Sequence, residues 1–261
     1  MHKTTAEARD FAQRLSELLR DQANVGSEGA SAGRTPVIIV IAAPFTALSA
    51  LASELATRKP GTPPVELAAQ DVYWEDHGAF TGEVSAPMLK DSGCQYVLIG
   101  HSERRQLFGE TDATVNQKVT AALRHGLRPI LCVGETWEQR SGGETKPVLA
   151  GQVTNALAGI AKDRADDVVI AYEPVWAIGS SHPAKADEAS DAHRHIRATA
   201  TTLWGQDAGE RLPILYGGSV TPDNIGAFLA IHEVDGALIG GACLDPAKFA
   251  RIVAIAESVS S

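Results

Sequence analysis

Apolar and polar positions follow two different periods along this chain. Seven short runs are apolar nearly throughout, a pattern typical of strands that are covered on both faces. These runs predict strands over Val37–Ala43, Val65–Gln70, Tyr96–Gly100, Pro129–Val133, Val168–Tyr172, Ile214–Gly217 and Ala237–Gly240. The segments between them show the helical period, and they predict helices near 45–58, 85–93, 112–125, 146–162, 186–204, 222–230 and 246–257.

The chain opens on a helical pattern. Residues 5–21 place their apolar side chains on one face, and Thr4 followed by Glu7 is a capping-box signal, so we predict a first helix there. The next segment, 24–36, is rich in Gly and Ser and predicts a flexible loop. Two later helix starts, each an N-cap residue followed by proline, are predicted at Thr221-Pro222 and Asp245-Pro246.

The alternation of strands and helices predicts a parallel sheet built from βαβ units. An open doubly wound sheet would concentrate its functional residues at one Gly-rich turn. Here such residues follow many strands, which favours a (β/α)8 TIM barrel with its site at the carboxyl ends of the strands. They are Gln70, Gly100-His101, Gly134-Glu135, Glu173, Gly217-Gly218-Ser219 and Gly240-Gly241.

The number of predicted elements does not close such a barrel. The pattern gives seven strands and eight helices over a single domain, residues 1–261, and it begins with a helix. A βα barrel begins with a strand, so we expect the first strand to be absent from this sequence. Seven strands would leave two unpaired sheet edges, which favour aggregation.

Composition narrows the classes of function. The 261 residues include 32 acidic and 23 basic side chains, and the net charge of −9 argues against a nucleic-acid or anionic-membrane partner. No run approaches the ~18 apolar residues that a membrane span requires, and the N-terminus lacks a signal-peptide pattern. Three cysteines without a close pair argue against disulfides or a zinc knuckle. We expect a soluble, cytoplasmic protein.

Glu173 is the first candidate for chemistry. A carboxylate at the end of a buried strand is placed to take a proton, because an apolar wall can raise its basicity. The alternative is a structural glutamate paired with an arginine. The segment that follows, from Pro174 to Gly179, predicts either a lid hinged at its ends or an ordinary βα loop.

His101 is the second candidate, since it follows a predicted strand and opens a helical turn. A helix N-terminus disfavours the imidazolium form, so a neutral ring at this place could polarise a carbonyl or donate a proton. The alternative is a structural hydrogen bond. His182, His193 and His195 could suggest a metal, but the last two are two residues apart and do not share a helix face. We therefore predict no metal site.

Two Gly-rich turns end the last two predicted strands. Gly217-Gly218-Ser219 and Gly240-Gly241 allow backbone N–H groups to approach an anion closely. In βα barrels this pair of loops is a frequent phosphate site. The alternative is two tight turns without a ligand.

Taken together, these segments resemble triosephosphate isomerases over nearly the whole chain, in the family's order and spacing. AYEPVWAIG, GHSERR and YGGSV are highly specific in combination. The matching segments are Ala68–Asp71, Gly78–Val84, Gly100–Arg105, Cys132–Thr136, Ala171–Gly179, Tyr216–Val220 and Asp235–Leu244.

The resemblance implies an isomerase of glycolysis and gluconeogenesis that interconverts dihydroxyacetone phosphate and glyceraldehyde 3-phosphate without a cofactor. It implies that Glu173 moves the proton between two carbons and that a neutral His101 acts on the carbonyl. It also implies a homodimer. The remaining implied residues are Gly179, Ser219, Gly240 and Gly241 at the phosphate, Ser102 and Glu103 in support, and Thr81, Gly82 and Glu83 in the loop that enters the partner.

Two departures from the family pattern affect these expectations. The family's first strand ends in Asn-Trp-Lys-Met, and Met1 matches that final methionine, so the strand with its catalytic Lys and Asn is absent here. Glu103 and Thr81 would then lose their partners, and an unpaired buried charge is costly. The lid's far half, where the family has Thr-Gly-Lys-Thr-Ala, is Ser180–Ala184 here, and Pro183 fixes a backbone angle in the hinge.

Two other functions remain open from the residues. A phosphate-binding aldolase or lyase on the same fold would need a Schiff-base lysine at a strand end, and the predicted strand ends carry none. A catalytically impaired product, or a non-catalytic phosphate-binding barrel, would follow from the missing Lys and Asn. A late start codon and a genuinely shortened gene both fit the sequence.

Overall fold

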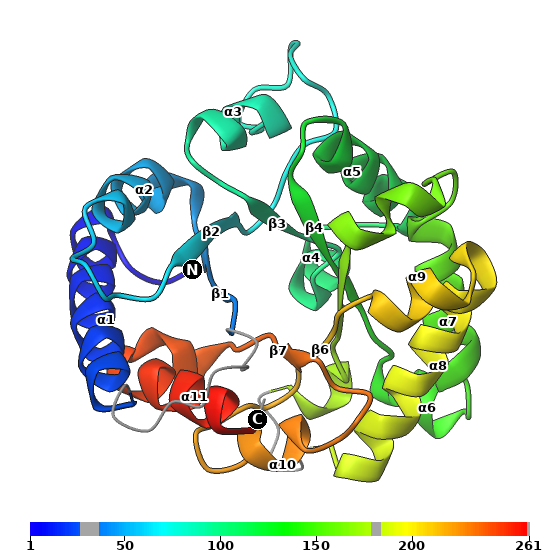
Figure 1. Ribbon diagram of the computed structural model, residues 1–261. Coiled ribbons are helices and arrows are strands. Elements are labelled where there is room, and N and C mark those ends of the chain that lie inside the picture. Colours follow the sequence, from blue (N-terminus) through cyan, green and yellow to red (C-terminus); the bar gives the residue numbers. More distant parts are fainter. Residues whose placement is uncertain (27–36, 179–183, 260–261) are drawn as a thin grey trace.

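A curled parallel sheet forms the centre of the computed structural model, which describes residues 1–26, 37–178 and 184–259 (Figure 1). Within those residues each strand pairs only with its neighbours in sequence, in the order β1 to β7. The strands are β1 (Ile39–Ala43), β2 (Val65–Ala69), β3 (Tyr96–Ile99), β4 (Arg128–Val133), β5 (Val169–Tyr172), β6 (Ile214–Tyr216) and β7 (Gly236–Ala237). Six of the predicted strands are confirmed with small shifts at their ends, and the seventh is confirmed only as the two-residue β7, which overlaps its predicted range at Ala237.

Helices surround the sheet on its outer face, which confirms the predicted TIM-barrel fold (Figure 1). They are α1 (Thr5–Gly26), α2 (Leu48–Ala56), α3 (Ala86–Asp91), α4 (Ser102–Leu107), α5 (Asp112–Arg124), α6 (Trp137–Ser141), α7 (Thr145–Ala156), α8 (Ala186–Trp204), α9 (Gln206–Arg211), α10 (Ile225–Leu229) and α11 (Pro246–Val259). Short 3-10 turns lie at Phe45–Ala47, Lys162–Asp167, Val175–Ala177 and Gly241–Leu244.

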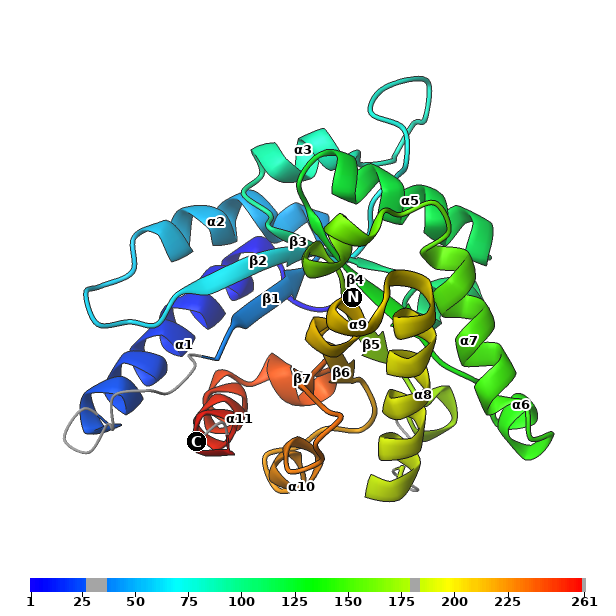
Figure 2. The ribbon, with the colours of Figure 1, turned by 45° about the vertical axis from the view of Figure 1, so that its right-hand side comes forward.

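The sheet stays open between its first and last strands. Among the described residues β1 pairs only with β2 and β7 only with β6, so the barrel is incomplete, as the strand count predicted. Helix α1 packs against both α2 and α11 and therefore covers the outside of this opening. Figure 2 shows β1 and β7 as the two ends of the curled sheet.

Apolar side chains form three clusters, because each strand points alternate residues inward and outward. The largest cluster lies between the sheet and the helices. A second, which includes Tyr96, Ile130 and Cys132, fills the inside of the barrel. The third lies under α1, where Phe11 and Leu15 pack with residues of β1 and α11. The apolar face predicted for the first helix therefore holds that helix on the sheet.

Two of the predicted helix starts are confirmed, and a third is wrong. Thr4 and Glu7 form the capping box of α1, and Asp245 caps α11 by accepting from the N–H groups of Ala247 and Lys248. The start predicted at Thr221-Pro222 is wrong: this dipeptide lies in a turn closed by the Thr221 N–H and the Asn224 side chain, and α10 begins at Ile225.

The short helices α6 and α9 were not predicted, and of α4 only the turn that His101 opens was expected. Each has five or six residues, which is less than two turns and too short to show a helical period. Most of the predicted flexible loop, residues 27–36, lies outside the described residues. No helix in the described part of the chain is long and apolar enough to cross a membrane.

Candidate active site

Glu173 and His101 meet at the carboxyl ends of two parallel strands. Glu173 follows β5 directly, and His101 lies two residues after the end of β3. His101 Nε2 lies 3.0 Å from Glu173 Oε1. The Glu173 residue is only 2% exposed, whereas the His101 side chain keeps 27% of its surface open. The strand ends therefore place a buried carboxylate against an imidazole that still reaches solvent.

Ser102 holds the Glu173 carboxylate from the other side. Its backbone N–H donates to Glu173 Oε2 at 2.9 Å, and its hydroxyl donates to Oε1 at 3.3 Å. Ser102 is the first residue of α4, so its N–H has no partner within the helix and is available. The predicted supporting residue thus contacts the candidate base directly.

The hydrogen bonds of His101 define which ring nitrogen carries the proton. Nδ1 accepts from the Glu103 N–H at 3.4 Å, so Nε2 is the protonated nitrogen and donates to Glu173. Burial lowers the pKa of His101, but the hydrogen bond and charge of Glu173 outweigh burial and raise it overall. This direction is opposite to the effect expected from the helix N-terminus alone, because the Glu173 carboxylate lies closer.

Two strand-end glycines make room for Glu173. A Cβ atom on Gly134 would lie 1.7 Å from the Glu173 carbonyl oxygen, and one on Gly217 would lie 3.1 Å from its Cγ. The backbone also fixes this residue, since its N–H donates to the carbonyl of Val133 at 2.7 Å. Any larger residue at position 134 would push the base out of place.

A second strand-end glutamate shows what a structural carboxylate looks like in this fold. Glu135, after β4, is fully buried and accepts hydrogen bonds from Tyr172 at 3.2 Å and from Trp176 Nε1 at 2.9 Å. Arg140 pairs with it at 3.3 Å. The alternative of an arginine-paired structural glutamate therefore describes Glu135, whereas Glu173 contacts a histidine and a serine.

The predicted phosphate residues lie on the loops after β6 and β7. In the described part of the chain the backbone N–H groups of Ser219 and Gly240 donate no hydrogen bond to another residue. Side-chain space beside Gly240 and Gly241 is empty of protein atoms within 4 Å. Both features leave room for an anion. Gly179 and the lid segment up to Pro183 lie outside the described residues.

The loop between β2 and α3 projects away from the barrel (Figure 1) and carries Thr81, Gly82 and Glu83, all exposed. Glu103 also points to solvent, with 73% of its side chain exposed and its carboxylate 4.0 Å from His101 Nδ1. The expectation that Glu103 would be a buried charge without a partner is therefore wrong for this structure, since water solvates it.

The remaining histidines of interest are structural. His193 is completely buried, its Nδ1 lies 3.1 Å from the Glu233 carbonyl, and its ring packs edge-on against Tyr172. Burial lowers the pKa of His193 to about 4. His195 lies 2.8 Å from the Lys146 carbonyl. The described residues contain no cluster of three or more potential metal ligands; His182 lies outside them.

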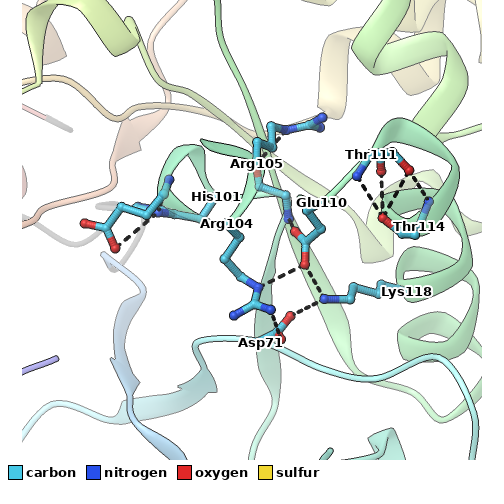
Figure 3. A network of polar contacts seen from close by, with 10 residues as sticks. Asp71, His101, Arg104, Arg105, Glu110, Thr111, Thr114 and Lys118 are labelled. Carbon is cyan, nitrogen blue, oxygen red and sulfur yellow. Dashed lines mark hydrogen bonds and ion pairs between the residues drawn. The ribbon is translucent and has the colours of Figure 1, made fainter. Parts of the chain in front are cut away.

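A buried ion cluster next to the site was not predicted (Figure 3). Lys118 and Arg104 each pair with both Asp71 and Glu110, and all but Arg104 are almost fully buried. One signal in the sequence could have indicated it. Lys118 lies three residues after Val115, on the apolar face of α5, where a cation must have buried acceptors.

These features define a βα-barrel protein in which a buried carboxylate meets an imidazole at the carboxyl ends of the strands. A family model described as triosephosphate isomerase matches residues 1–256. The chain belongs to the triosephosphate isomerase family.

Curated relatives and a solved structure support this assignment at high coverage. The triosephosphate isomerases of Moorella thermoacetica and Chloroflexus aurantiacus are 47% and 48% identical to this chain, and each alignment covers 97% of the chain and 94% of the relative. A crystal structure of triosephosphate isomerase from Bartonella henselae superimposes with a TM-score of 0.83 at 33% identity, covering 98% of this chain and 94% of that one.

Proposed function

We propose that this chain interconverts dihydroxyacetone phosphate and glyceraldehyde 3-phosphate by proton transfer through an enediolate. The contact between Glu173 Oε1 and His101 Nε2 carries the proposal. A base and a proton donor at this spacing can act on neighbouring atoms of one small substrate, the carbon and the carbonyl oxygen. Family membership supports the same reaction.

The proposed reaction begins with the carboxylate of Glu173 turning from His101 to the substrate. It takes a proton from the carbon next to the carbonyl, and the electron pair moves to the carbonyl oxygen. His101 Nε2–H donates to that oxygen as its charge grows, which lowers the barrier. Glu173 then returns the proton to the other carbon, while the hydroxyl on the first carbon becomes the new carbonyl and gives its proton, through Nε2 of His101, to the former carbonyl oxygen. Ser102, which holds the carboxylate in the free state, would release it during this turn.

The phosphate group is proposed to bind over the loops after β6 and β7. The N–H groups of Ser219 and Gly240, which donate to none of the described residues, point to this role, because backbone donors beside glycine can approach phosphate oxygens without a side chain in between. Gly241 and Gly179 are assigned to the same group by the family pattern alone. No metal is needed for this binding.

We further propose that full activity needs one more parallel strand between β1 and β7. That position is open in the described part of the sheet, and α1 already covers it from outside. The family pattern places a lysine and an asparagine at the end of such a strand. The second candidate function, a weakly phosphate-binding barrel with little turnover, follows if the position stays open.

The homodimer and the cytoplasmic location are proposals as well. The projecting loop with Thr81, Gly82 and Glu83 exposes Phe80, whose ring lies tilted against that of Tyr73 and offers an apolar tip to a second copy of this chain. All three cysteines are unpaired, as expected in a reducing compartment.

The proposed function is tested by following both directions of the isomerisation in excess chelator. Two proteins are compared: residues 1–261, and the same chain preceded by a strand that ends in Asn-Trp-Lys. We expect robust turnover from the extended chain and weak turnover from the shorter one. Activity that chelator abolishes and zinc restores would contradict the metal-free mechanism. Phosphate binding without turnover in both would favour the second candidate.

A further inference from the structure

Gly100, the residue immediately before His101, is held from both sides. Its N–H donates to Glu110 Oε2 at 3.0 Å, and its carbonyl accepts from Arg105 Nε at 2.8 Å. Its φ angle of 74° lies in the left-handed region, and a Cβ atom would meet Arg105, Val115 and Cys132 within 3.2 Å. The backbone conformation at Gly100 therefore favours glycine, and hydrogen bonds hold it on both sides.

The two groups that hold Gly100 are themselves fixed. Arg105 pairs with Asp112 at 2.7 Å. Glu110 accepts from Arg104 Nε at 2.9 Å and from Lys118 Nζ, and its side chain is 4% exposed (Figure 3). Burial raises the pKa of Glu110, but Lys118 and Arg104 outweigh it and lower the pKa overall. Glu110 thus remains an anion and a strong acceptor for the Gly100 N–H.

We infer that Glu110 and Arg105 are positioning residues that set the place of the His101 ring relative to Glu173. The link is covalent and short: the orientation of the Gly100 peptide determines where the His101 Cα lies and where its ring points. The ring must reach Glu173 Oε1 at 3.0 Å and, in the proposed reaction, a substrate oxygen. Among the described residues, the polar partners of the Glu173 side chain are Ser102 and His101, and neither Glu110 nor Arg105 forms a hydrogen bond or ion pair with it. Only the effect on turnover rests on the proposed function; the effect on the ring does not.

A matched pair of double variants separates this role from general stability. Glu110→Met/Lys118→Met removes one negative and one positive charge together with the acceptor of the Gly100 N–H. Asp71→Leu/Lys118→Met removes the same charges but keeps Glu110 with Arg104 and Gly100. Both leave Arg104 one carboxylate partner, so neither leaves an unpaired charge in the cluster. Both are made in the full chain.

The first readout needs no substrate. The proton between His101 Nε2 and Glu173 gives a downfield signal in proton NMR of the free protein. We expect Glu110→Met/Lys118→Met to lose or shift this signal and to speed exchange of the Gly100 amide, while Asp71→Leu/Lys118→Met retains both. Glu110→Gln/Lys118→Met, which keeps an acceptor oxygen, should restore the signal. An unchanged His101 signal in the Glu110→Met double variant would overturn the inference.

The second readout is turnover. Displacing a reacting group by about 1 Å can cost about 10²-fold in rate. We expect kcat of Glu110→Met/Lys118→Met to be at least tenfold below that of the Asp71→Leu pair, with KM within about threefold. Equal kcat values would contradict the positioning role. If the wild-type chain does not isomerise the substrate, the proposed function fails and the proton signal still decides the positioning role.

A further variant applies if the Glu110→Met pair does not fold. Arg105→Met/Asp112→Leu also leaves the net charge of the protein unchanged, and it removes the donor that holds the Gly100 carbonyl. The same loss of the His101 signal is expected. A folded Arg105→Met/Asp112→Leu protein with the wild-type signal would exclude the role for Arg105 and, with it, the two-sided hold on Gly100.

Discussion

The two sides of this incomplete barrel differ in how completely their side chains are buried and their strands are paired. On the side of β3 to β5, the interior residues Ile130 and Cys132 are buried, and Glu173 has defined partners in His101 and Ser102. On the side of β1 and β7, the interior residues Val40 and Leu238 remain half-buried, and each of these two strands has one side that pairs with no other described strand. One side has a complete packing environment and the other lacks a neighbour.

This difference indicates that the contact between Glu173 and His101 forms independently of the closure of the barrel. Glu173 and His101 follow β5 and β3, and the contacts that hold them come from each other and from Ser102 at the start of α4. The opening instead exposes sheet edge and interior surface, which affects stability and solubility. Variants on the two sides should therefore change different measured quantities.

The largest expected effect is on turnover, from a substitution on the β3–β5 side of the barrel. In the active form of the chain, Glu173→Gln should lower kcat by about 10²–10⁴-fold with little change in Tm, because the amide keeps the shape but cannot take a proton. Glu135→Gln is the matched control at the neighbouring strand end and should lower Tm more than kcat. Turnover near that of the parent in Glu173→Gln would mean that Glu173 is structural.

Closing the opening should give the next largest effect. A chain extended by a strand ending in Asn-Trp-Lys should melt at a higher temperature and turn over at least ~10² times faster than residues 1–261, because a placed cation stabilises charge on the substrate oxygen by ~3 kcal/mol. The same strand ending in Asn-Trp-Met should raise Tm without the gain in rate. Equal Tm and equal activity of residues 1–261 and the lysine form would show that the strand is dispensable.

Acid should lower the free energy of unfolding through His193, whose ring packs against Tyr172 of β5. Its pKa is lowered to about 4 in the folded protein, below the ordinary 6.5, so the unfolded chain binds the proton more readily between these values. Stability therefore falls as pH drops from 6.5 to 4, by about 3 kcal/mol in total, and levels off below. His193→Phe should flatten this part of the urea-unfolding profile against pH. A profile as steep as that of the parent would assign the loss to other groups.

The smallest expected effect is on phosphate affinity, from a substitution in the loop after β7. Gly240→Val should weaken binding of both substrate and inorganic phosphate about tenfold, because the side chain would cover the free N–H. The space beside Gly240 holds no protein atom within 4 Å, so Tm should change little. Phosphate affinity measured by calorimetry decides this, and an unchanged affinity would place the phosphate elsewhere.

The sequence predicted the strands well because their apolar runs are short, bounded by turn residues and buried on both faces. It also singled out Glu173 and His101, since both follow such runs directly. It did not predict the ion cluster of Asp71, Glu110 and Lys118, because the three come from different parts of the chain. Only Lys118, a cation on an apolar helix face, gave a local signal.

What the sequence by itself determined is the order of elements, the seven strands and the two candidate site residues Glu173 and His101, because each depends on residues close together along the chain. Only the tertiary structure decided which partner each side chain has. Glu135 and Glu173 both end buried strands and look alike in sequence, yet one meets an arginine and the other a histidine. Such pairings depend on strand register and on contacts between distant residues, which no local pattern encodes.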